Sequence, residues 1–419
     1  MPLDVVYLNH VAVPSGAERA LTRLLPALTG VRPHVILAEH GWLAGELGSL
    51  GISVEVLELP RRTRALSRER VGPSLPVAAI ADTGRYARTL AVRLRELSPD
   101  LVHANSLKAN VYGHLAARRA GVPSVWHARD RIVPEYLPGA AVPALRRYAR
   151  TVPSGLISVS ESTRRSVIGG RAATDCQPVI HDPLPAHAGT RPRATDPSRF
   201  VVAMTGRIAE WKGQDVFLRA FAEAFASDPA AEARILGQPL FGETAYERSL
   251  YDLAAELGIA DRVTFTGYVD DVWDELAQAD VVVHASRIPE PFGQVVPEAM
   301  AAGCAVICAA AGGPLETVRD GVTGLHARPG DASDYARALR TLRTHPALTA
   351  RLAAAGQQDA LERFAPAVIA EQVMDCYRAT LSKQPAQRGA TAKLPRFRGV
   401  AHEQRDLDAV GGVELRQDA

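Results

Sequence analysis

Two glutamates stand eight positions apart in a mostly apolar stretch, IPEPFGQVVPEAMAAG at residues 288–303. Glu290 precedes a proline, a phenylalanine and a glycine, and Glu298 falls one turn inside the Ala-rich run that we expect to be helical. Free N–H groups at a helix start form a ready anion site. Carboxylates for hydroxyl groups beside N–H groups for phosphates would suit a sugar nucleotide. The plainer interpretation is that both glutamates only favour a helix start electrostatically.

A second candidate pair is Arg207 and Lys212, which lie five positions apart in TGRIAEWKGQD, just after an expected strand. Both cations can converge on one diphosphate, because arginine offers a planar fork and lysine a point charge. Surface arginines and lysines are more often simply solvated. The spacing is not that of a Walker loop, since no Gly-rich run precedes GK[ST], and ATP hydrolysis is therefore not predicted.

The elements that must position these residues alternate between strand and helix along the chain. Strands are expected within VVYLNHVAV, HVILAEH, SVEVLEL, DLVHANS, PSVWHARD and GLISVSES, and again within FVVAMTG, ARILG, VTFTG, DVVVHAS and AVICAA. Such alternation with short Gly/Pro breaks is typical of parallel sheets covered on both faces. We predict an α/β protein with two Rossmann-like domains that face each other across a cleft. The predicted boundaries are a first domain at 1–183, a linker at 184–199, a second domain at 200–382 and a disordered tail at 383–419.

Composition excludes several other classes. At 419 residues the chain is long enough for two domains, and 47% hydrophobic with 22% charged residues is globular. A net charge of +2 does not indicate a nucleic-acid binder. The opening MPLDVVYLNHVAV resembles a first strand rather than a signal peptide, and the sequence has no run of 18 apolar residues. We therefore expect a cytoplasmic protein.

The four cysteines and the acidic residues do not predict a disulfide scaffold or a metal site. Cys304 and Cys308 flank AVI in an expected buried strand, where they would serve as small core residues. Cys176 and Cys376 add no disulfide-scaffold density. Asp406-Leu407-Asp408 has an Asp-x-Asp pattern, but it lies in the tail.

The segment from Arg207 to Glu316 resembles the donor half of the retaining glycosyltransferases of family 4, the glycosyl transferases group 1, which have the GT-B fold. The resemblance covers nearly all of residues 1–380 and is more specific in the C-terminal half. It implies that the first domain binds the acceptor and the second the nucleotide-sugar donor. Pro297 departs from the family, which more often has an ordinary helix former at that position. The segment Ser15-Gly16-Ala17-Glu18 departs as well, because the family often has two glycines ahead of the glutamate.

The resemblance also implies roles for individual residues. Glu290 would accept hydrogen bonds from hydroxyls of the donor hexose, and Glu298 from the ribose. Arg207 and Lys212 would stabilise the departing diphosphate, and His127 would meet the donor sugar near the transferred carbon. The other implied donor contacts are Gly16, Gly267, Tyr268, Phe292, Gly293 and Gln294, with the backbone of AGGPLETV (311–318) nearby; simple turns would explain the glycines equally well.

Strand ends of the first domain supply further candidates. His103 in LVHANS and His127 in VWHARD both end expected strands on the cleft side, although such histidines are more often structural. We place His103 and Arg129 as acceptor contacts, and Asn9 and His10 could also touch an acceptor. The arginine-rich stretches PRRTRALSRER (60–70) and PALRRYAR (143–150) would suit an acceptor-facing or peripheral membrane surface, or simply a solvated one.

The resulting functional expectation is retaining transfer of a hexosyl unit from a nucleoside-diphosphate sugar, with UDP preferred, to a glycan, lipid-linked or small-molecule acceptor. No cofactor and no metal are expected, because the GT-B fold does not need a metal and the leaving phosphate would take the acceptor's proton. Two alternatives stay open: a nucleotide-sugar epimerase of the same fold, and a non-catalytic nucleotide-sugar-binding protein.

Overall fold

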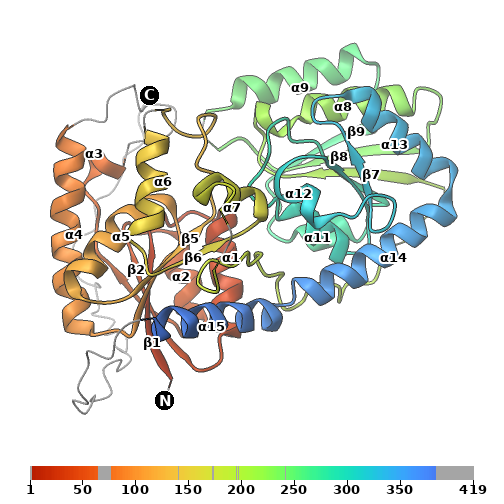
Figure 1. Ribbon diagram of the computed structural model, residues 1–419. Helices are drawn as coiled ribbons and strands as arrows, with labels where there is room; N and C mark the ends of the chain where they lie inside the picture. The colour runs from red at the N-terminus through yellow and green to blue at the C-terminus, as the bar shows by residue number, and fades with distance from the viewer. Residues whose placement is uncertain are drawn as a thin grey trace, which may run out of the picture.

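Two α/β domains lie side by side in the structure, a computed structural model (Figure 1). It describes residues 2–64, 77–139, 141–171, 174–194, 196, 198–240 and 242–383. Most of the arginine-rich stretch 60–70 and nearly all of the predicted tail 383–419 lie outside the described residues.

The first domain is built on a six-stranded parallel sheet. Its strands are β1 (Leu3–Asn9), β2 (Val31–Leu37), β3 (Ser53–Val56), β4 (Leu101–Ala104), β5 (Ser124–Ala128) and β6 (Gly155–Ser158). The order β3-β2-β1-β4-β5-β6 reverses between β1 and β4, and ligands of such sheets bind beyond the carboxyl ends at this switch point. Its helices are α1 (Gly16–Leu24), η1 (Leu25–Ala27), α2 (Trp42–Ser49), α3 (Arg61–Arg64), α4 (Val77–Leu97), α5 (Leu107–Ala120), α6 (Ala141–Thr151) and α7 (Glu161–Ile168).

The second domain repeats this topology. Its strands are β7 (Phe200–Thr205), β8 (Ala231–Leu236), β9 (Val263–Gly267), β10 (Val281–His284), β11 (Ala305–Ala309) and β12 (Leu325–Ala327). They form a parallel sheet in the order β12-β11-β10-β7-β8-β9, with the reversal between β7 and β10. The chain continues through η2 (Glu210–Lys212), α8 (Gln214–Ala224), α9 (Thr244–Glu256), η3 (Ala260–Arg262), α10 (Val272–Leu276), α11 (Val295–Ala301), α12 (Gly312–Thr317), α13 (Ala332–Thr344), α14 (Pro346–Arg363) and α15 (Pro366–Ser382). The prediction of two Rossmann-like α/β domains is confirmed.

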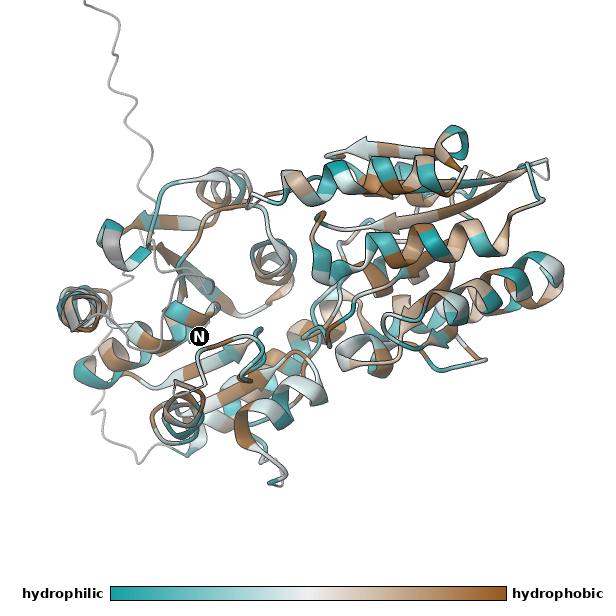
Figure 2. Ribbon diagram, turned by 90° about the horizontal axis from the view of Figure 1, so that it is seen from above, coloured by the Kyte–Doolittle hydropathy of each residue, from teal (hydrophilic) through white to brown (hydrophobic). Residues whose placement is uncertain are grey.

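Apolar residues cover both faces of each sheet. In the second domain, Phe217 and Phe221 of α8 belong to one hydrophobic cluster, and Met300 of α11 belongs to the cluster on the other face. Figure 2 shows mostly apolar strands between helices on which apolar and polar residues alternate. Burial on both faces explains why the strands are near-continuous apolar runs rather than alternating ones.

The C-terminal helix differs from the predicted domain boundaries. The prediction assigned 200–382 to the second domain, yet α15 packs against the first domain, where Ile369, Val373 and Tyr377 share a core with Tyr7 of β1. Figure 1 shows α14 leaving the second domain and α15 running beneath the first. The sequence pattern indicated a helix there, but not which core its apolar side would join. The described residues of the predicted linker 184–199 contain no helix or strand.

Cys304 and Cys308 are buried as predicted; Cys176 and Cys376 are buried too, and all four are free thiols. Burial raises the pKa of Cys304 to about 12, so the thiol stays neutral and behaves as a small apolar group. In the part of the chain that the structure describes, no helix is long and apolar enough to cross a membrane.

Candidate active site

The carboxyl ends of both sheets meet at the interface between the domains, and side chains from each domain contact the other there. Gln294 Nε2 donates to the backbone oxygen of Gly16 over 2.8 Å. Arg23 of α1 pairs with Glu298 of α11 over 2.7 Å. The loop before Glu290 is also held from the first domain, because Arg131 and Tyr136 both donate to the backbone oxygen of Pro289.

Glu290 lies at the centre of the second-domain half of the site and is only 6% exposed. Its Oε1 atom receives hydrogen bonds from Lys212 Nζ at 2.8 Å, from His284 Nε2 at 2.9 Å, and from the Ser286 hydroxyl. Burial alone would raise the pKa of this carboxyl, but Lys212 and His284 outweigh it and hold the pKa far below its usual range. No described residue bonds to Oε2, so an ionised oxygen of fixed orientation is left for another hydroxyl group.

Lys212 reaches Glu290 because the loop after β7 packs tightly against the end of β10. Gly213 has φ +78°, and a Cβ there would lie 2.3 Å from the backbone oxygen of Ala285. Only glycine allows this approach. The ring of Trp211 lies 4.5 Å from Lys212 Nζ and 5.7 Å from the Arg207 guanidinium, so the two cations flank one indole. Arg207 also pairs with Glu243 over 3.1 Å. The structure thus brings both predicted phosphate-binding cations together.

The start of α12 supports the loop that carries Glu290. Glu290 forms a bridge with Gly312, and the Gly313 N–H donates to the Glu290 backbone oxygen over 2.9 Å. A Cβ at Gly312 would lie 2.3 Å from that same oxygen, so this glycine serves close loop packing. The Glu316 carboxylate receives the N–H groups of Glu161 and Ser162, both at 2.7 Å, and therefore holds the start of α7 across the domain interface.

Glu298 lies in the first turn of α11, as predicted, and is 8% exposed. Arg23 supplies its counter-charge from the other domain, so the proposed ribose acceptor already has an ionic partner. Pro297 stands early in α11, before the helix needs its N–H group, and α11 continues through Ala301.

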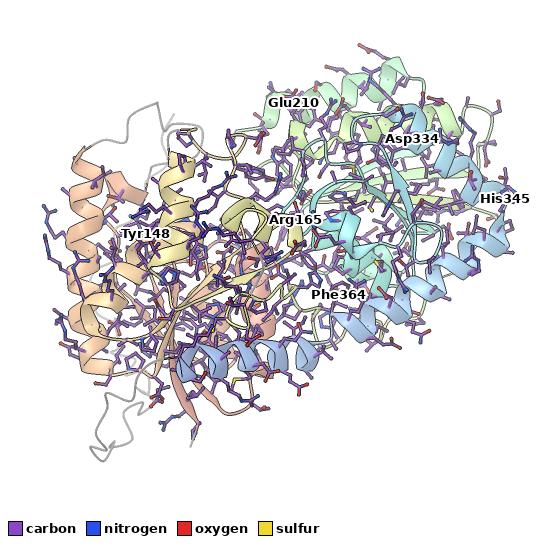
Figure 3. All side chains as sticks on the ribbon, viewed as in Figure 1. Tyr148, Arg165, Glu210, Asp334, His345 and Phe364 are labelled. Carbon is purple, nitrogen blue, oxygen red and sulfur yellow. The ribbon has the colours of Figure 1, made fainter. Side chains whose placement is uncertain are left out.

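The other predicted donor contacts of the second domain are two glycines and two aromatic residues. Gly267 and Gly293 have positive φ values, +69° and +78°, and place backbone at strand and helix ends. Tyr268 is half exposed, and its hydroxyl accepts from Arg19 across the interface at 3.3 Å. The Phe292 ring, however, is buried and stacks on His181 with centroids 5.3 Å apart, near Phe364 at the domain junction (Figure 3). The Phe292 side chain therefore packs in the core rather than facing a ligand.

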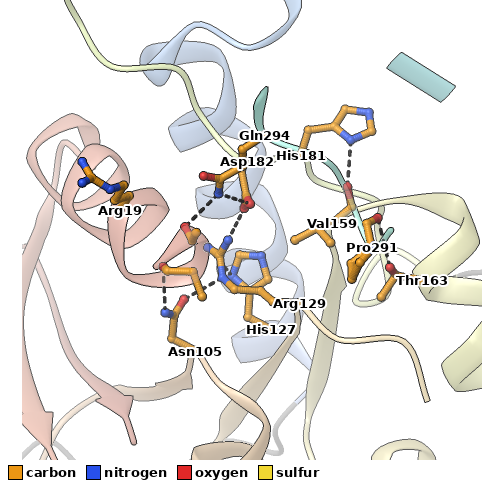
Figure 4. Close-up of polar contacts among 12 residues, drawn as sticks. Arg19, Asn105, His127, Arg129, Val159, Thr163, His181, Asp182, Pro291 and Gln294 are labelled. Carbon is orange, nitrogen blue, oxygen red and sulfur yellow. Dashed lines mark hydrogen bonds and ion pairs between the residues drawn. The ribbon is translucent and has the colours of Figure 1, made fainter. Parts of the chain in front are cut away.

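Arg129 forms the centre of the first-domain half of the site, shown in Figure 4. It pairs with Asp182 and donates to Asn105 Oδ1 over 2.9 Å. Gln294 Nε2 donates to Asp182 Oδ2 over 2.7 Å, which ties this network to the second domain. Arg129 is 8% exposed, so in this conformation its guanidinium holds the interface rather than facing an acceptor.

The two predicted histidines lie together at the ends of β4 and β5. His103 Nε2 is 3.0 Å from His127 Nδ1, and His103 Nδ1 is 2.7 Å from the Tyr377 hydroxyl. Burial, with Arg129 next, lowers the pKa of His103 to about 3 and the pKa of His127 well below its usual value, so both rings are neutral. His103 is fully buried with both nitrogens paired. It lies behind His127 and offers no surface to the predicted acceptor.

The remaining first-domain candidates have partners within the domain. His10 Nδ1 lies 2.6 Å from the Ser106 hydroxyl, and Asn9 Nδ2 donates to Glu18 Oε1 over 2.8 Å. Burial raises the pKa of Glu18. Of the second arginine-rich stretch, Arg146 donates to backbone oxygens of Ile132 and Ser166, whereas Arg147 and Arg150 are exposed. Within the described ranges, no three His, Cys, Asp or Glu side chains are grouped to hold a metal; Asp406 and Asp408 lie outside them.

Sequence reasoning missed His284, Asp182 and Arg23. His284 ends β10 within VVVHAS, so the strand-end rule applied to His103 and His127 would have found it. Asp182 and Arg23 have no local signal, because their partners Arg129 and Glu298 lie 53 and 275 positions away.

Comparisons with known proteins identify the family and the fold. The family model for glycosyl transferases group 1 matches residues 191–359, and that for glycosyltransferase family 4 matches residues 42–177. A D-inositol 3-phosphate glycosyltransferase of Rhodococcus opacus is 34% identical over 304 residues, which is 67% of this chain and 67% of that protein. Among solved structures, Anabaena HepE in complex with UDP and glucose has a TM-score of 0.75 at 27% identity, covering 90% of this chain and 100% of that one. The same protein with UDP-glucose gives 0.75 at 28% identity, covering 91% and 100%.

Proposed function

Because the chain belongs to the family 4 glycosyltransferases of group 1 and has their GT-B fold, we propose that it transfers a hexosyl unit from a UDP-sugar to an alcohol acceptor with retention of anomeric configuration. The chain is a glycosyltransferase; the donor, the acceptor and the stereochemistry are the proposal.

The observation that carries the proposal is the Lys212–Glu290 pair. Three donors converge on Glu290 Oε1 and leave Oε2 to accept from a sugar hydroxyl. A carboxylate held ionised makes stronger hydrogen bonds than a neutral acceptor. Beside it, Lys212 and Arg207 flank Trp211. A diphosphate bound by these cations would place its attached sugar next to Glu290.

Leaving-group stabilisation is the chemistry that these residues would supply. As the bond between the anomeric carbon and the diphosphate breaks, negative charge grows on the leaving oxygens, where Arg207 and Lys212 can stabilise it. The acceptor hydroxyl would attack from the face that the diphosphate leaves, and the leaving phosphate would take its proton. This route has the proper stoichiometry: one glycosidic bond forms, one phosphoester bond breaks, and one proton moves to the nucleotide product.

A same-face reaction also fits the hydrogen-bonding of the nearby first-domain carboxylates, Asp182 and Glu18. A double displacement would need a carboxylate nucleophile beneath the anomeric carbon. Asp182 is bound by Arg129 and Gln294, and Glu18 by Asn9 and Ser15, so both are committed to structural hydrogen bonds. Both are also buried, so neither offers an exposed oxygen to act as a nucleophile.

UDP is the proposed nucleotide because HepE, at 27–28% identity, is solved with UDP and with UDP-glucose. D-inositol 3-phosphate is the first acceptor to try, because relatives at 30–36% identity are named for it. A nucleotide-sugar donor also favours a cytoplasmic location. Calorimetric titration of UDP, GDP and ADP should give the tightest binding for UDP; preference for another base would overturn this part of the proposal.

An epimerase of the same fold is the rival that a simple incubation separates. With UDP-glucose or UDP-N-acetylglucosamine alone, a transferase leaves the sugar configuration unchanged, whereas an epimerase converts it without any acceptor. Appearance of a second UDP-sugar in the donor-only reaction would therefore rule out the transferase as the main activity.

We further propose that transfer needs no metal ion, because Arg207 and Lys212 are two cations that can both interact with the leaving diphosphate. Adding excess EDTA, with dialysis beforehand, should change kcat and donor KM by less than about twofold, since no step uses an ion as Lewis acid. Restoration of a lost activity by Mg²⁺ or Mn²⁺ would contradict this prediction.

A further inference from the structure

A buried row of polar rings leads from the C-terminal helix to the site. Tyr377 of α15 contacts His103 of β4, and His103 contacts His127 of β5, over 2.7 Å and 3.0 Å. The Tyr7 hydroxyl lies 3.1 Å beyond that of Tyr377. Tyr377 and His103 have no exposed surface and His127 has 2%, so water does not compete for these hydrogen bonds.

The direction of the row is set at its inner end by Arg129. Its Nη2 lies 3.5 Å from His127 Nδ1, on the side of the ring that also faces His103. A guanidinium only donates, so Nδ1 beside it must carry a lone pair rather than a proton. Because burial keeps His127 neutral, the single ring proton must then be on Nε2.

The positions of the other protons in the row follow from this tautomer of His127. If His127 Nδ1 accepts, then His103 Nε2 must donate to it across 3.0 Å. Neutral His103 then has a lone pair on Nδ1, which accepts the Tyr377 hydroxyl proton. The Tyr7 hydroxyl, 3.1 Å from that of Tyr377, is the other hydrogen-bond partner of Tyr377. The opposite direction would require a proton on His127 Nδ1 facing the Arg129 guanidinium.

His127 Nε2 is the open end of this row. It is buried, and no described residue is within hydrogen-bonding reach of it. A buried N–H group without a partner is costly, and natural structures rarely leave one unless a ligand or water completes it. His127 stands at the carboxyl end of β5, where ligands of such sheets bind.

We propose that Tyr377 and His103 are positioning residues that hold His127 in the tautomer whose Nε2–H donates to an oxygen lone pair of the bound substrate. The proposal rests on the proposed function and assigns a role to α15, the helix that returns from the second domain. A donor-only Nε2–H selects an acceptor oxygen at this point and excludes a substrate group that can only donate.

The tautomers can be read directly in the ligand-free protein. Long-range ¹H–¹⁵N correlation spectra of ¹⁵N-histidine-labelled protein, with assignments from His103→Asn and His127→Asn, distinguish Nε2–H from Nδ1–H rings. Both histidines should be Nε2–H and neutral through the neutral pH range. A His127 ring protonated at Nδ1 would overturn the proposal, whatever the enzyme's activity.

Tyr377→Phe and Tyr7→Phe form a matched pair, because each removes one hydroxyl from the same buried contact. Both rings pack against His103, but only the Tyr377 hydroxyl is hydrogen-bonded to it, and phenylalanine keeps the ring in either variant. Tyr377→Phe should raise the Nδ1–H fraction of His127 and lower kcat by about 3- to 10-fold, the worth of one neutral hydrogen bond, with donor KM within about twofold. Tyr7→Phe should leave the tautomers and kcat unchanged.

A merely structural role for Tyr377 would give a different pattern: both variants would lose thermal stability alike, and the tautomers of Tyr377→Phe would stay as in the wild type. That result would overturn the proposal. If the wild type shows the expected tautomers but transfers no sugar from any UDP-hexose, the proposed function fails, and the tautomer shift in Tyr377→Phe still decides the role of the row.

Discussion

Replacing Lys212 by alanine is expected to lower kcat by about 100-fold or more, the scale of losing one preorganised donor to a developing anion. The ammonium group would stabilise charge that grows on the leaving diphosphate, so its loss should affect the transition state more than the bound donor. UDP affinity, measured by calorimetry, should fall by a smaller factor. Lys212→Arg should recover only part of kcat, because a planar fork does not fit a point-charge site.

The contact between Lys212 and Glu290 adds a second route by which the lysine could act. Its Nζ lies 2.8 Å from Glu290 Oε1 and helps to keep that carboxylate ionised and oriented. A double-mutant cycle with Glu290→Gln separates the two routes. If Lys212 acts on the diphosphate as well, the double variant should be slower than Glu290→Gln alone. Equal rates would mean that the lysine serves only to hold Glu290, and an unaffected kcat in Lys212→Ala would remove it from the mechanism.

Replacing Glu290 by glutamine is the second change with a large expected effect. The side chain keeps its size but loses the ionised oxygen proposed to hold the donor sugar, so transfer should fall by about 100-fold or more. Binding of UDP, which lacks the sugar, should change by less than about threefold. Glu290→Ala should abolish transfer while the fold survives, and near-wild-type activity in a folded variant would refute the sugar-site assignment.

Glu298→Gln is the matched control, because it alters the other carboxylate of the same stretch. If Glu298 accepts from the ribose, its neutral variant should bind UDP about 10-fold more weakly, on the scale of one charge-assisted hydrogen bond. The two variants should thus show opposite patterns: weak UDP binding for Glu298→Gln and slow transfer for Glu290→Gln. Identical patterns would mean that the two glutamates do not read different parts of the donor.

Much of the fold could be predicted because the signals are local. Near-continuous apolar strands such as DVVVHAS, short Gly breaks and intervening helical patterns determine a doubly covered parallel sheet without any long-range information. The position of Arg207 and Lys212 after β7, and of Glu290 after β10, follows from the same rule, because carboxyl ends of parallel strands share one edge.

What could not be predicted depends on contacts between distant parts of the chain. An amphipathic pattern identifies α15 as a helix, but its packing on β1 of the other domain depends on shape complementarity over more than 350 positions. For the same reason His103 was predicted to contact the acceptor. Its place at the end of β4 could be predicted from the sequence, whereas its buried hydrogen bond to Tyr377 could not. The backbone of 311–318 was predicted to lie near the donor, but no local signal showed that the missing Cβ of Gly312 allows the close approach of the Glu290 loop.

The most direct test of the central claim is the stereochemistry of transfer. The reaction of wild-type protein with UDP-α-D-glucose, or with the UDP-hexose that binds best, can be followed by ¹H NMR with and without acceptor. The account predicts that a new α-anomeric signal of the acceptor-linked sugar grows in step with free UDP, and only when acceptor is present. A β-linked product, or conversion of the donor to another UDP-sugar in the absence of acceptor, would contradict it.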